Sequence, residues 1–532
     1  MKPGALLDDI TARALEFRWL RTALAPASPY GDRIFERIVP FAPGEEAQAE
    51  ARARRVAAIA SGFSSQTLDA MRDVFRNAPD ASNAIARASM GDTLSDANLL
   101  ELQRFFDACV RLDTLTDENA ALPRVASAAV VESARRIELG RAGKFGFYLA
   151  DAFDPALERA RSSLAQAQAE YDAARGRATA AIATLLGREV EPNEFIVMRA
   201  DLNGALPDGV RVVREAPTYL LCEIEETDAT LAALDRRDAL ATAAAAAEET
   251  VRRALTDAIR EHAAALNAAA DAFGEADVLV AAARFTQTHD CTVASIVSEP
   301  ALHATGACFI PLELELEKEG RHFTPISIAI DDVAVLTGPN MGGKSVCLRT
   351  CGFIAICAAF GLPVPASNAA VALFAEISWL GVGADDEPGG LLSSFAREVV
   401  RLRDLLKRDR RPLFALLDEF ARTTTPREGK ALLVAVLKRL QAIGARGLSA
   451  THLAGIAPAA GVRHFAVRGL RGIPNRPATS DLHQALESLA SSMDYTIEEV
   501  TDEAAARSDA IALAALLGLD ERVITDAYDV ME

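Results

Sequence analysis

The sequence predicts a mixed fold, in which an all-α core carries a coiled two-helix arm with a small β tip and is followed by an α/β domain with a P-loop. Three observations support this. Apolar residues recur at helical spacing in the first half of the chain, strand-like runs alternate with helices after residue 276, and GPNMGGKS at 338–345 lies between a strand and a helix. The chain has 532 residues, too many for one core, which indicates roughly three or four domains.

The first 120 residues have the pattern of amphipathic helices joined by short loops. In the segment SDANLLELQRFFDACVRL, for example, apolar side chains follow the helical period at Leu99, Leu102, Phe106 and Val110. Further along, Asp154-Pro155 is typical of a helix start, because proline suits the first position of a helix.

Two long helices are predicted to form the arm. The first has a heptad seam at Leu157, Leu164, Tyr171, Ala178 and Leu185, with alanines three places after the first four of them, including Ala181. The second, at about 228–275, has Leu255, Ile259, His262, Leu266, Ala269 and Phe273 at alternating spacings of four and three. We expect an antiparallel coiled pair, in which His262 is favoured as a core histidine over a ligand.

Between these helices, residues 188–227 are predicted to form the β tip. The runs FIVMRADL, VRVV and TYLLCEI have strand character, and Asn203-Gly204 and Asp208-Gly209 are turn signals. The tip contains nine acidic residues and four arginines. Because a DNA-binding surface needs the opposite sign of charge, DNA is disfavoured as a ligand of this tip.

After residue 276 we predict strands at 312–317 (LELELE), 333–338 (VAVLTG) and 413–419 (LFALLDE). The most apolar stretch, Cys351 to Ile377, is interrupted by Gly361, Pro363 and Pro365. A buried helix and strand are therefore favoured over a membrane span. The N-terminal segment has no apolar core typical of a signal peptide, so a cytoplasmic location is expected.

Charge and cysteine content exclude several classes of protein. The formal net charge is −19, so nucleic-acid binding would require a local basic patch. The seven cysteines are odd in number and include no CxxC pair, which argues against a disulfide framework and against a four-ligand structural metal site.

The segment 338–345 matches the pattern GxxxxGK[ST] in the context that phosphate binding requires. Backbone N–H groups at a helix N-terminus bind phosphate, the lysine reaches the β and γ oxygens, and the hydroxyl of Ser345 binds Mg²⁺. The predicted ATP-binding residues are Gly338, Pro339, Asn340, Met341, Gly342, Gly343, Lys344 and Ser345.

Two later strands end in candidate catalytic residues. The strand 413–417 is followed by Asp418, expected to hold Mg²⁺, and by Glu419, expected to orient and deprotonate the attacking water. The strand LSATH ends in His452, a candidate γ-phosphate sensor. Alone, the acids fit a solvated strand end and the histidine a structural role; the P-loop favours the catalytic interpretation.

These motifs resemble the MutS ATPases. TGPNMGGKS is similar to the P-loop sequence of that family. Its other motifs are resembled, in the same order, by VPA at 364–366, VGADDE at 382–387, SSFAREV at 393–399, DEFARTTTPREG at 418–429 and ATH at 450–452. The tail at 508–527 resembles its closing helices. The resemblance implies an ABC-type ATPase fold that uses ATP and Mg²⁺.

The resemblance also implies a domain order and a dimer. It divides the chain into a helical core or lever (1–153), a clamp-like arm (154–275), a helical connector (276–300), the ATPase domain (301–500) and C-terminal dimerisation helices (501–532). A homodimer, or a dimer with a MutS-like paralogue, would place Ser393 or Ser394 in the partner's ATP site. A serine pair that caps its own helix is the alternative.

Several positions depart from the family pattern. Ala421 and Thr423 stand where the family usually has glycines, Glu428 replaces its aspartate and Val346 its threonine. FTPISI at 323–328 lacks the family's Asn-Asp. The Mg²⁺-binding and water-activating groups are kept, and we expect a difference in communication within the dimer.

Family resemblance implies a DNA mismatch repair-like ATPase, but the mismatch-reading domain with its Phe-x-Glu wedge is not recognisable. Phe273-Gly274-Glu275 and Phe374-Ala375-Glu376 match its letters only by accident, since they lie in the arm and in the ATPase domain. The alternative is a protein-remodelling ATPase, such as a reactivating factor for a cobalamin-dependent lysine or ornithine aminomutase. A nucleotide-locked scaffold is the third hypothesis.

Overall fold

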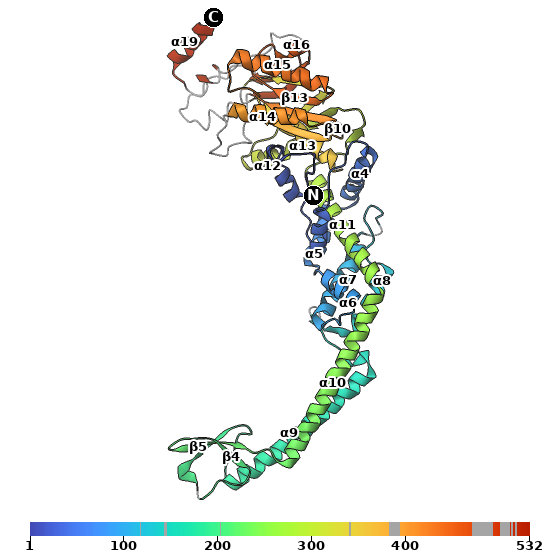
Figure 1. The fold of residues 1–532 in the computed structure, drawn as a ribbon, viewed down its shortest axis with the longest axis vertical. Coiled ribbons are helices and arrows are strands. Elements are labelled where there is room, and N and C mark those ends of the chain that lie inside the picture. The colour runs from blue at the N-terminus through green and yellow to red at the C-terminus, as the bar shows by residue number, and fades with distance from the viewer. Residues whose placement is uncertain are drawn as a thin grey trace. The chain divides into compact units, whose positions relative to one another are not determined.

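The computed structural model describes residues 1–116, 119–142, 146–202, 204–339, 342–381, 394–470, 493–500, 511, 514–515 and 519–531. The chain divides into two compact units. Residues 1–77, 114–123 and 271–532 form the first, and residues 78–113 and 124–270 form the second. Helices and several sheets occur together, which confirms the mixed fold class (Figure 1). In the described part of the chain, no helix is both long and apolar enough to cross a bilayer.

The first unit begins with short helices: α1 (Asp9–Ala14), α2 (Phe17–Ala23), α3 (Pro29–Phe35), α4 (Glu46–Gly62) and α5 (Ser65–Asn77). A buried carboxylate fixes the start of α3 to a later helix of the same unit. Asp277 accepts hydrogen bonds from the backbone N–H groups of Ala27 and Ser28 and from the Ser28 hydroxyl, at 2.7–3.0 Å. These donors satisfy a carboxylate that has no solvent exposure.

The second unit contains α6 (Ser82–Met90), α7 (Asp96–Thr116), α8 (Ala128–Ile137), β1 (Arg141–Ala142), β2 (Gly146–Phe147), α9 (Pro155–Leu186), β3 (Phe195–Met198), β4 (Val210–Glu215), β5 (Tyr219–Ile224) and α10 (Asp228–Glu261), with three single-turn helices at Glu138–Gly140, Asp151–Phe153 and Arg199–Asp201. The dividing lines between the units fall near the end of α7 and inside α11 (Ala263–Thr288). The predicted helix start is confirmed, because Asp154 caps α9 and Pro155 opens it.

Helices α9 and α10 lie side by side, and the strands β3, β4 and β5 form a small sheet at their end (Figure 1). The predicted seam of α9 is correct from Leu157 to Ala174 and then shifts by one position. Ile182 is buried, whereas Ala181 and Leu185 are exposed. A helix with 3.6 residues per turn drifts about 20° per heptad from a strict seven-residue repeat, which explains the shift.

The second long helix of the prediction is interrupted. α10 ends at Glu261, His262 has a non-helical backbone, and α11 begins at Ala263. His262 is only partly buried, while its predicted seam neighbours Ile259 and Leu266 have no exposure. In α7 the prediction for Val110 was wrong as well, since it is 44% exposed and the adjacent Cys109 is buried.

The first unit continues with β6 (Ser295–Val297), β7 (Leu302–Ala307), α12 (Ile310–Lys318), β8 (Ile326–Ile330), β9 (Val333–Thr337), α13 (Lys344–Ala359), β10 (Asn368–Ala372), β11 (Glu376–Gly381), α14 (Ser394–Lys407), β12 (Leu413–Asp418), α15 (Pro426–Ala442), β13 (Arg446–Ala450), α16 (Ile456–Ala460), β14 (Arg463–Leu470), β15 (Met493–Glu499) and α19 (Glu521–Met531). The predicted strand at 312–317 is wrong, because those residues belong to α12. Leucine and glutamate are strong helix formers, and proline in the first turn favours a helix start there.

Two sheets enclose α13. In the described residues, the larger sheet has the order β11-β12-β13-β9-β14-β15. β15 is antiparallel to β14, and all the other neighbouring strands are parallel to one another. The smaller sheet has the order β6-β10-β7-β8. α13 packs against β12 and β13 of the first sheet and against β7 and β10 of the second. The predicted buried helix and strand within 351–377 are thereby confirmed as α13 and β10.

The opposite face of the larger sheet is covered by α14, α15 and α16. Their apolar residues form one core cluster with alternate residues of β12, namely Leu413, Ala415 and Leu417. Because side chains alternate along a strand, Asp418 points to the face that carries α13. This alternation brings the acid that ends β12 toward the first turn of α13.

Candidate functional site

The loop between β9 and α13 is a tight turn that only glycines allow. Gly338 and Gly343 have positive φ angles of 150° and 79°, a region that other residues rarely adopt. A Cβ atom on Gly342 would lie 2.9 Å from the carbonyl oxygen of Pro339. Asn340 and Met341 lie outside the described residues. The described glycines therefore permit a backbone that brings N–H groups to the helix N-terminus.

Lys344, the first residue of α13, folds back over this loop. Its ammonium donates hydrogen bonds to the carbonyl oxygens of Gly338 and Pro339, both at 2.9 Å, and the residue is 5% exposed. Burial lowers the pKa of Lys344, and the nearby Glu419 and Asp418 partly offset that effect. A cation held in this way is suited to binding phosphate oxygens.

Ser345 and Asp418 meet although they are 73 residues apart in the chain. The Ser345 hydroxyl donates a hydrogen bond of 2.8 Å to Oδ1 of Asp418. Burial raises the pKa of Asp418, and the hydrogen bond from Ser345 opposes this rise. The carboxyl ends of the parallel strands β9 and β12 lie at one edge of the sheet, the usual place for ligands in such folds.

Glu419 and His452, the predicted catalytic residues, line one cavity of about 30 Å³ together with Thr451. The backbone N–H of Glu419 donates to the carbonyl oxygen of Ala450, 3.0 Å away, which ties the end of β12 to the end of β13. Glu419 also has a left-handed backbone, with φ of 52°. His452 is exposed. The structure therefore brings these two residues together beside Asp418.

The two serines predicted to act on a partner cannot be placed. Ser393 lies outside the described residues, and α14 begins at Ser394, whose side chain is not described. Their role stays a prediction.

Two residues that the sequence did not single out contact the site. The carboxylate of Glu398, a residue of α14 that is 8% exposed, accepts a hydrogen bond of 3.0 Å from the Ala421 N–H. Ala421 has φ of 60°, the conformation for which glycine is suited. Glu398 thus holds the loop that follows Glu419. The sequence feature that could have identified Glu398 is its position inside the segment SSFAREV, which resembles a family motif.

Tyr495 of β15 is the second such residue. A Cβ atom on Gly343 would lie 3.3 Å from its ring, so the tyrosine covers the end of the loop that precedes α13. Burial raises the pKa of its hydroxyl, and Arg321 acts in the opposite direction. The alternation of Met493, Tyr495 and Ile497 indicates a strand in the sequence, but not which strand it joins.

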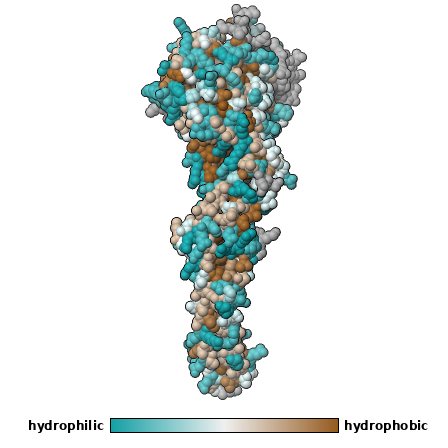
Figure 2. All heavy atoms as spheres, turned by 90° about the vertical axis from the view of Figure 1, so that its right-hand side faces the viewer, coloured by the Kyte–Doolittle hydropathy of each residue, from teal (hydrophilic) through white to brown (hydrophobic). Residues whose placement is uncertain are grey.

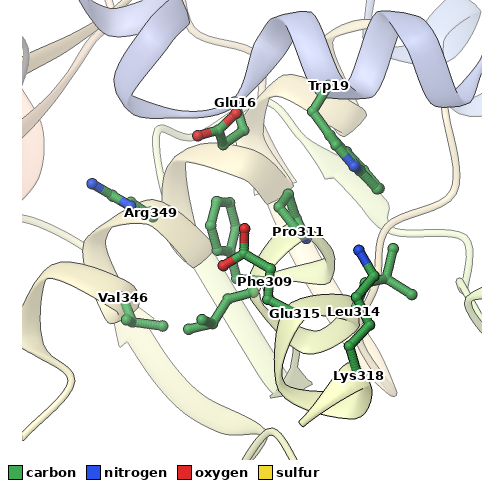
Figure 3. Close-up of a pocket in the computed structure, with 10 residues that line it drawn as sticks. Glu16, Trp19, Phe309, Pro311, Leu314, Glu315, Lys318, Val346 and Arg349 are labelled. Atoms are coloured by element: carbon green, nitrogen blue, oxygen red, sulfur yellow. The ribbon is translucent and has the colours of Figure 1, made fainter.

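A separate cavity of about 390 Å³ lies beside α13 (Figure 3). Trp19 enters it from α2, Glu315 and Lys318 from α12, and Arg349 from α13; the other lining residues are Glu16, Phe309, Pro311, Leu312, Leu314 and Val346. None of the predicted catalytic or ATP-binding residues lines it. It is therefore distinct from the site formed by Lys344, Ser345 and Asp418.

The donor set fits Mg²⁺ bound together with a phosphate compound. Ser345 and Asp418 offer hard oxygen atoms side by side. No cluster of three or more His, Cys, Asp or Glu side chains suited to a metal occurs among the residues described. Mg²⁺ commonly binds through one or two protein oxygens and completes its shell with water and phosphate. This edge of the sheet therefore suits a magnesium–nucleotide complex.

Comparison with known proteins gives one family model and several relatives. The model described as MutS domain V matches residues 334–532. The chain is 26% identical over 473 residues to the Endonuclease MutS2 of Symbiobacterium thermophilum, covering 84% of the chain and 56% of that protein. It is 26% identical over 500 residues to the DNA mismatch repair protein MutS of Dinoroseobacter shibae, covering 88% of the chain and 54% of that protein.

Similarity is higher over a shorter stretch in another relative. The chain is 31% identical over 249 residues to the DNA mismatch repair protein MutS of Haloquadratum walsbyi, covering 44% of the chain and 25% of that protein. The chain thus spans between a quarter and just over half the length of these relatives.

Proposed function

The chain belongs to the MutS family, and from this premise we propose that it is a magnesium-dependent ATPase. One observation carries the proposal: the Ser345 hydroxyl lies 2.8 Å from the Asp418 carboxylate at the sheet edge where the loop 338–345 meets β12. Serine and aspartate oxygens at that place are the ligands that Mg²⁺ takes when it binds nucleotide phosphates.

Each described residue then has a role in hydrolysis. Lys344 binds the β and γ phosphate oxygens, while Ser345 and Asp418 hold Mg²⁺, which neutralises charge that develops on the phosphates. Glu419 orients the attacking water and accepts its proton, and His452 senses the γ-phosphate from the neighbouring strand end. The buried Asp418 and Lys344 carry opposite charges whose burial shifts both pKa values, a frequent property of functional sites.

In this proposal two chains form a dimer with two composite sites. Ser393 or Ser394 of one chain completes the ATP site of the other, and residues 501–532 contribute to dimerisation. ATP binding closes the two ATPase domains and moves the lever and arm. The partner is a second copy of the chain or a MutS-like paralogue.

The substrate moved by this ATPase has two candidates. The names of the relatives, a DNA mismatch repair protein and an endonuclease, favour DNA and a role like mismatch repair. The net charge of −5 on residues 188–227 favours a protein client. A reactivating factor for a cobalamin-dependent lysine or ornithine aminomutase is a client-remodelling ATPase of that kind.

The ATPase proposal is tested by Glu419→Gln, which keeps the size of the side chain and removes its basicity. We expect ATP binding to be retained, measured with a fluorescent ATP analogue, and steady-state phosphate release to fall by about 10²- to 10⁴-fold. Glu299→Gln, at an exposed residue of the same unit, is the matched control. Normal turnover by Glu419→Gln would refute the assignment.

The choice of client is tested by adding candidate clients to the wild-type chain. If DNA is the client, duplex or branched DNA stimulates phosphate release, and its binding weakens steeply with salt. If a protein is the client, DNA has no effect, and a purified aminomutase is the first protein to test. A DNA effect with a steep salt dependence would eliminate the second candidate.

A further inference from the structure

The small sheet of the arm has two different faces. In the order β3-β5-β4, one face packs against the end of α9. Phe195 and Val197 of β3 and Leu220 and Cys222 of β5 are buried there and form one core cluster with Ile182. These residues form the inner core of the tip, so the alternate residues of each strand face outward.

The outward face is also apolar. Ile196 is 49% exposed, Met198 42% and Val213 47%. In the register of β3 and β5, Ile196 is paired with Leu221 and Met198 with Tyr219, and both partners are partly exposed. These paired apolar side chains form one continuous patch across the two strands. Antiparallel sheets that cover a core on one side normally have polar residues on the other, so an apolar outer face indicates a contact surface.

At the lower end of Figure 2, where the arm ends, apolar residues lie exposed among hydrophilic ones on the face that is drawn. The hydrophilic residues of the tip are mainly acidic, nine against four arginines in residues 188–227. Three arginines are already engaged within the tip. Arg199 pairs with Glu215 at 2.7 Å, Arg211 pairs with Glu223, and Arg188 donates to the carbonyl oxygen of Ile196.

The fourth arginine of the tip, Arg214, is exposed and is paired with Leu221 in the register of β4 and β5. Over the tip as a whole acids outnumber arginines, and Glu194, Asp201, Glu225 and Glu226 are exposed. A DNA duplex or an anionic lipid surface would be repelled by these acids. A second copy of the chain, whose net charge is −19, would bring charge of the same sign. Charge complementarity selects a partner with a basic rim around an apolar centre.

We propose that the outer face of this sheet, centred on Ile196, Met198 and Leu221, is a docking surface for a protein whose contact region has apolar residues surrounded by lysine or arginine. The surface is separate from the ATP site and its binding does not require hydrolysis, so the proposal goes beyond the ATPase function. The apolar centre provides the affinity, and the net negative charge of the tip favours a basic partner and speeds its approach.

The test uses the full chain and a defined probe, an amphipathic helical peptide with leucine on one face and lysine on the other. Its counterpart with glutamate in place of lysine is the charge control. We expect the lysine peptide to bind in fluorescence anisotropy and the glutamate peptide not to bind. The double variant Ile196→Ser/Met198→Ser should lower the affinity for the lysine peptide at least tenfold.

A matched control distinguishes this surface from general attraction to an acidic protein. Val39→Ser/Met90→Ser changes two apolar side chains that are 59% and 79% exposed elsewhere, and should leave the affinity for the peptide unchanged. All four altered side chains are exposed, so thermal melting and the rate of ATP hydrolysis should match the wild type. If the tip variant loses peptide binding but hydrolyses ATP at the wild-type rate, the docking surface acts independently of the ATP site.

Three outcomes would overturn the proposal. Equal affinity of the wild type and the tip variant for the lysine peptide would show that the patch does not bind it. Binding of a 30-base-pair duplex or of phosphatidylserine vesicles that is lost in the tip variant would assign the surface to DNA or to a membrane. Self-association in sedimentation that depends on Ile196 and Met198 would assign it to a second copy of the chain.

Discussion

Replacing Glu398 by alanine removes the acceptor of the Ala421 N–H. This hydrogen bond measures 3.0 Å and is buried, and it joins α14 to the loop that follows Glu419, the proposed catalytic residue. Ala421 is held in a left-handed conformation with φ of 60°, which for a residue with a side chain costs about 1–2 kcal/mol. Without its acceptor, this N–H no longer favours that conformation, and the loop is expected to populate others.

The magnitude follows from the cost of an unsatisfied buried donor, about 1–3 kcal/mol. If that cost acts on the position of the loop, the fraction of molecules with Glu419 in place falls roughly 5- to 150-fold, since about 1.4 kcal/mol is a factor of ten. The hydrogen bond of Glu398 acts on the loop after Glu419, whereas Lys344 and Ser345 are the residues proposed to bind the phosphates and Mg²⁺, so the affinity for ATP should change little. We therefore expect Glu398→Ala to lower kcat and leave KM for ATP nearly unchanged.

Steady-state phosphate release over a range of ATP concentrations separates the two constants. Glu398→Gln is the conservative comparison, because its amide oxygen can still accept from Ala421, and it should restore most of the lost kcat. A normal kcat for Glu398→Ala, even with a lower melting temperature, would refute the positioning role and leave Glu398 as a structural residue only.

Substitutions at two further positions test the buried charges. Asp418→Asn should raise the melting temperature of the nucleotide-free protein by a few degrees while reducing its stabilisation by Mg²⁺ and ATP. Because burial raises the pKa of Asp418 in the folded state, its ionisation costs stability above that pKa, and the gain from Asp418→Asn should disappear as the pH falls from that pKa to the ordinary pKa of aspartate. Asp277→Ala should lower the free energy of unfolding in urea by about 3 kcal/mol, because it leaves Ser28 and Ala27 with buried donors, whereas Asp277→Asn keeps an oxygen acceptor and should cost less. An unchanged melting temperature in the first case, or equal losses in the second, would contradict these predictions.

The central geometry of the site was predictable because local patterns determine it. GPNMGGKS after an apolar strand specifies a loop at a helix N-terminus, and an apolar strand that ends in acids places them at the same edge of a parallel sheet. Ser345 and Asp418 therefore meet as expected, 2.8 Å apart. The order of the strands in the sheet, by contrast, depends on tertiary packing.

Contacts that need tertiary register could not be predicted. Nothing local indicates that Glu398 reaches Ala421 or that Tyr495 covers Gly343, since each pair joins different parts of the chain. The strand predicted at 312–317 failed for a different reason. Its alternating leucines have the period of a strand, but leucine and glutamate have high helix propensity, and Leu312, Leu314 and Leu316 are each partly buried in α12.

The arm illustrates the limit of a heptad pattern. The seven-residue repeat from Leu157 identified a long helix with one buried stripe, which the structure contains. The end of the stripe was misplaced by one residue, at Ile182, because an unsupercoiled helix does not follow a seven-residue period for its whole length. The error in the predicted buried positions therefore grows with distance from the start of the repeat.

The most direct test of the ATPase proposal is phosphate release by the purified full chain with ATP and Mg²⁺, compared with EDTA and with Lys344→Ala. Lys344 is buried over the loop, and its ammonium donates hydrogen bonds to two carbonyl oxygens of that loop. We therefore expect Lys344→Ala to abolish binding of the phosphates while leaving most of the fold intact. We predict turnover that requires both Mg²⁺ and Lys344. Phosphate release that persists in EDTA, or at the wild-type rate in Lys344→Ala, would contradict it.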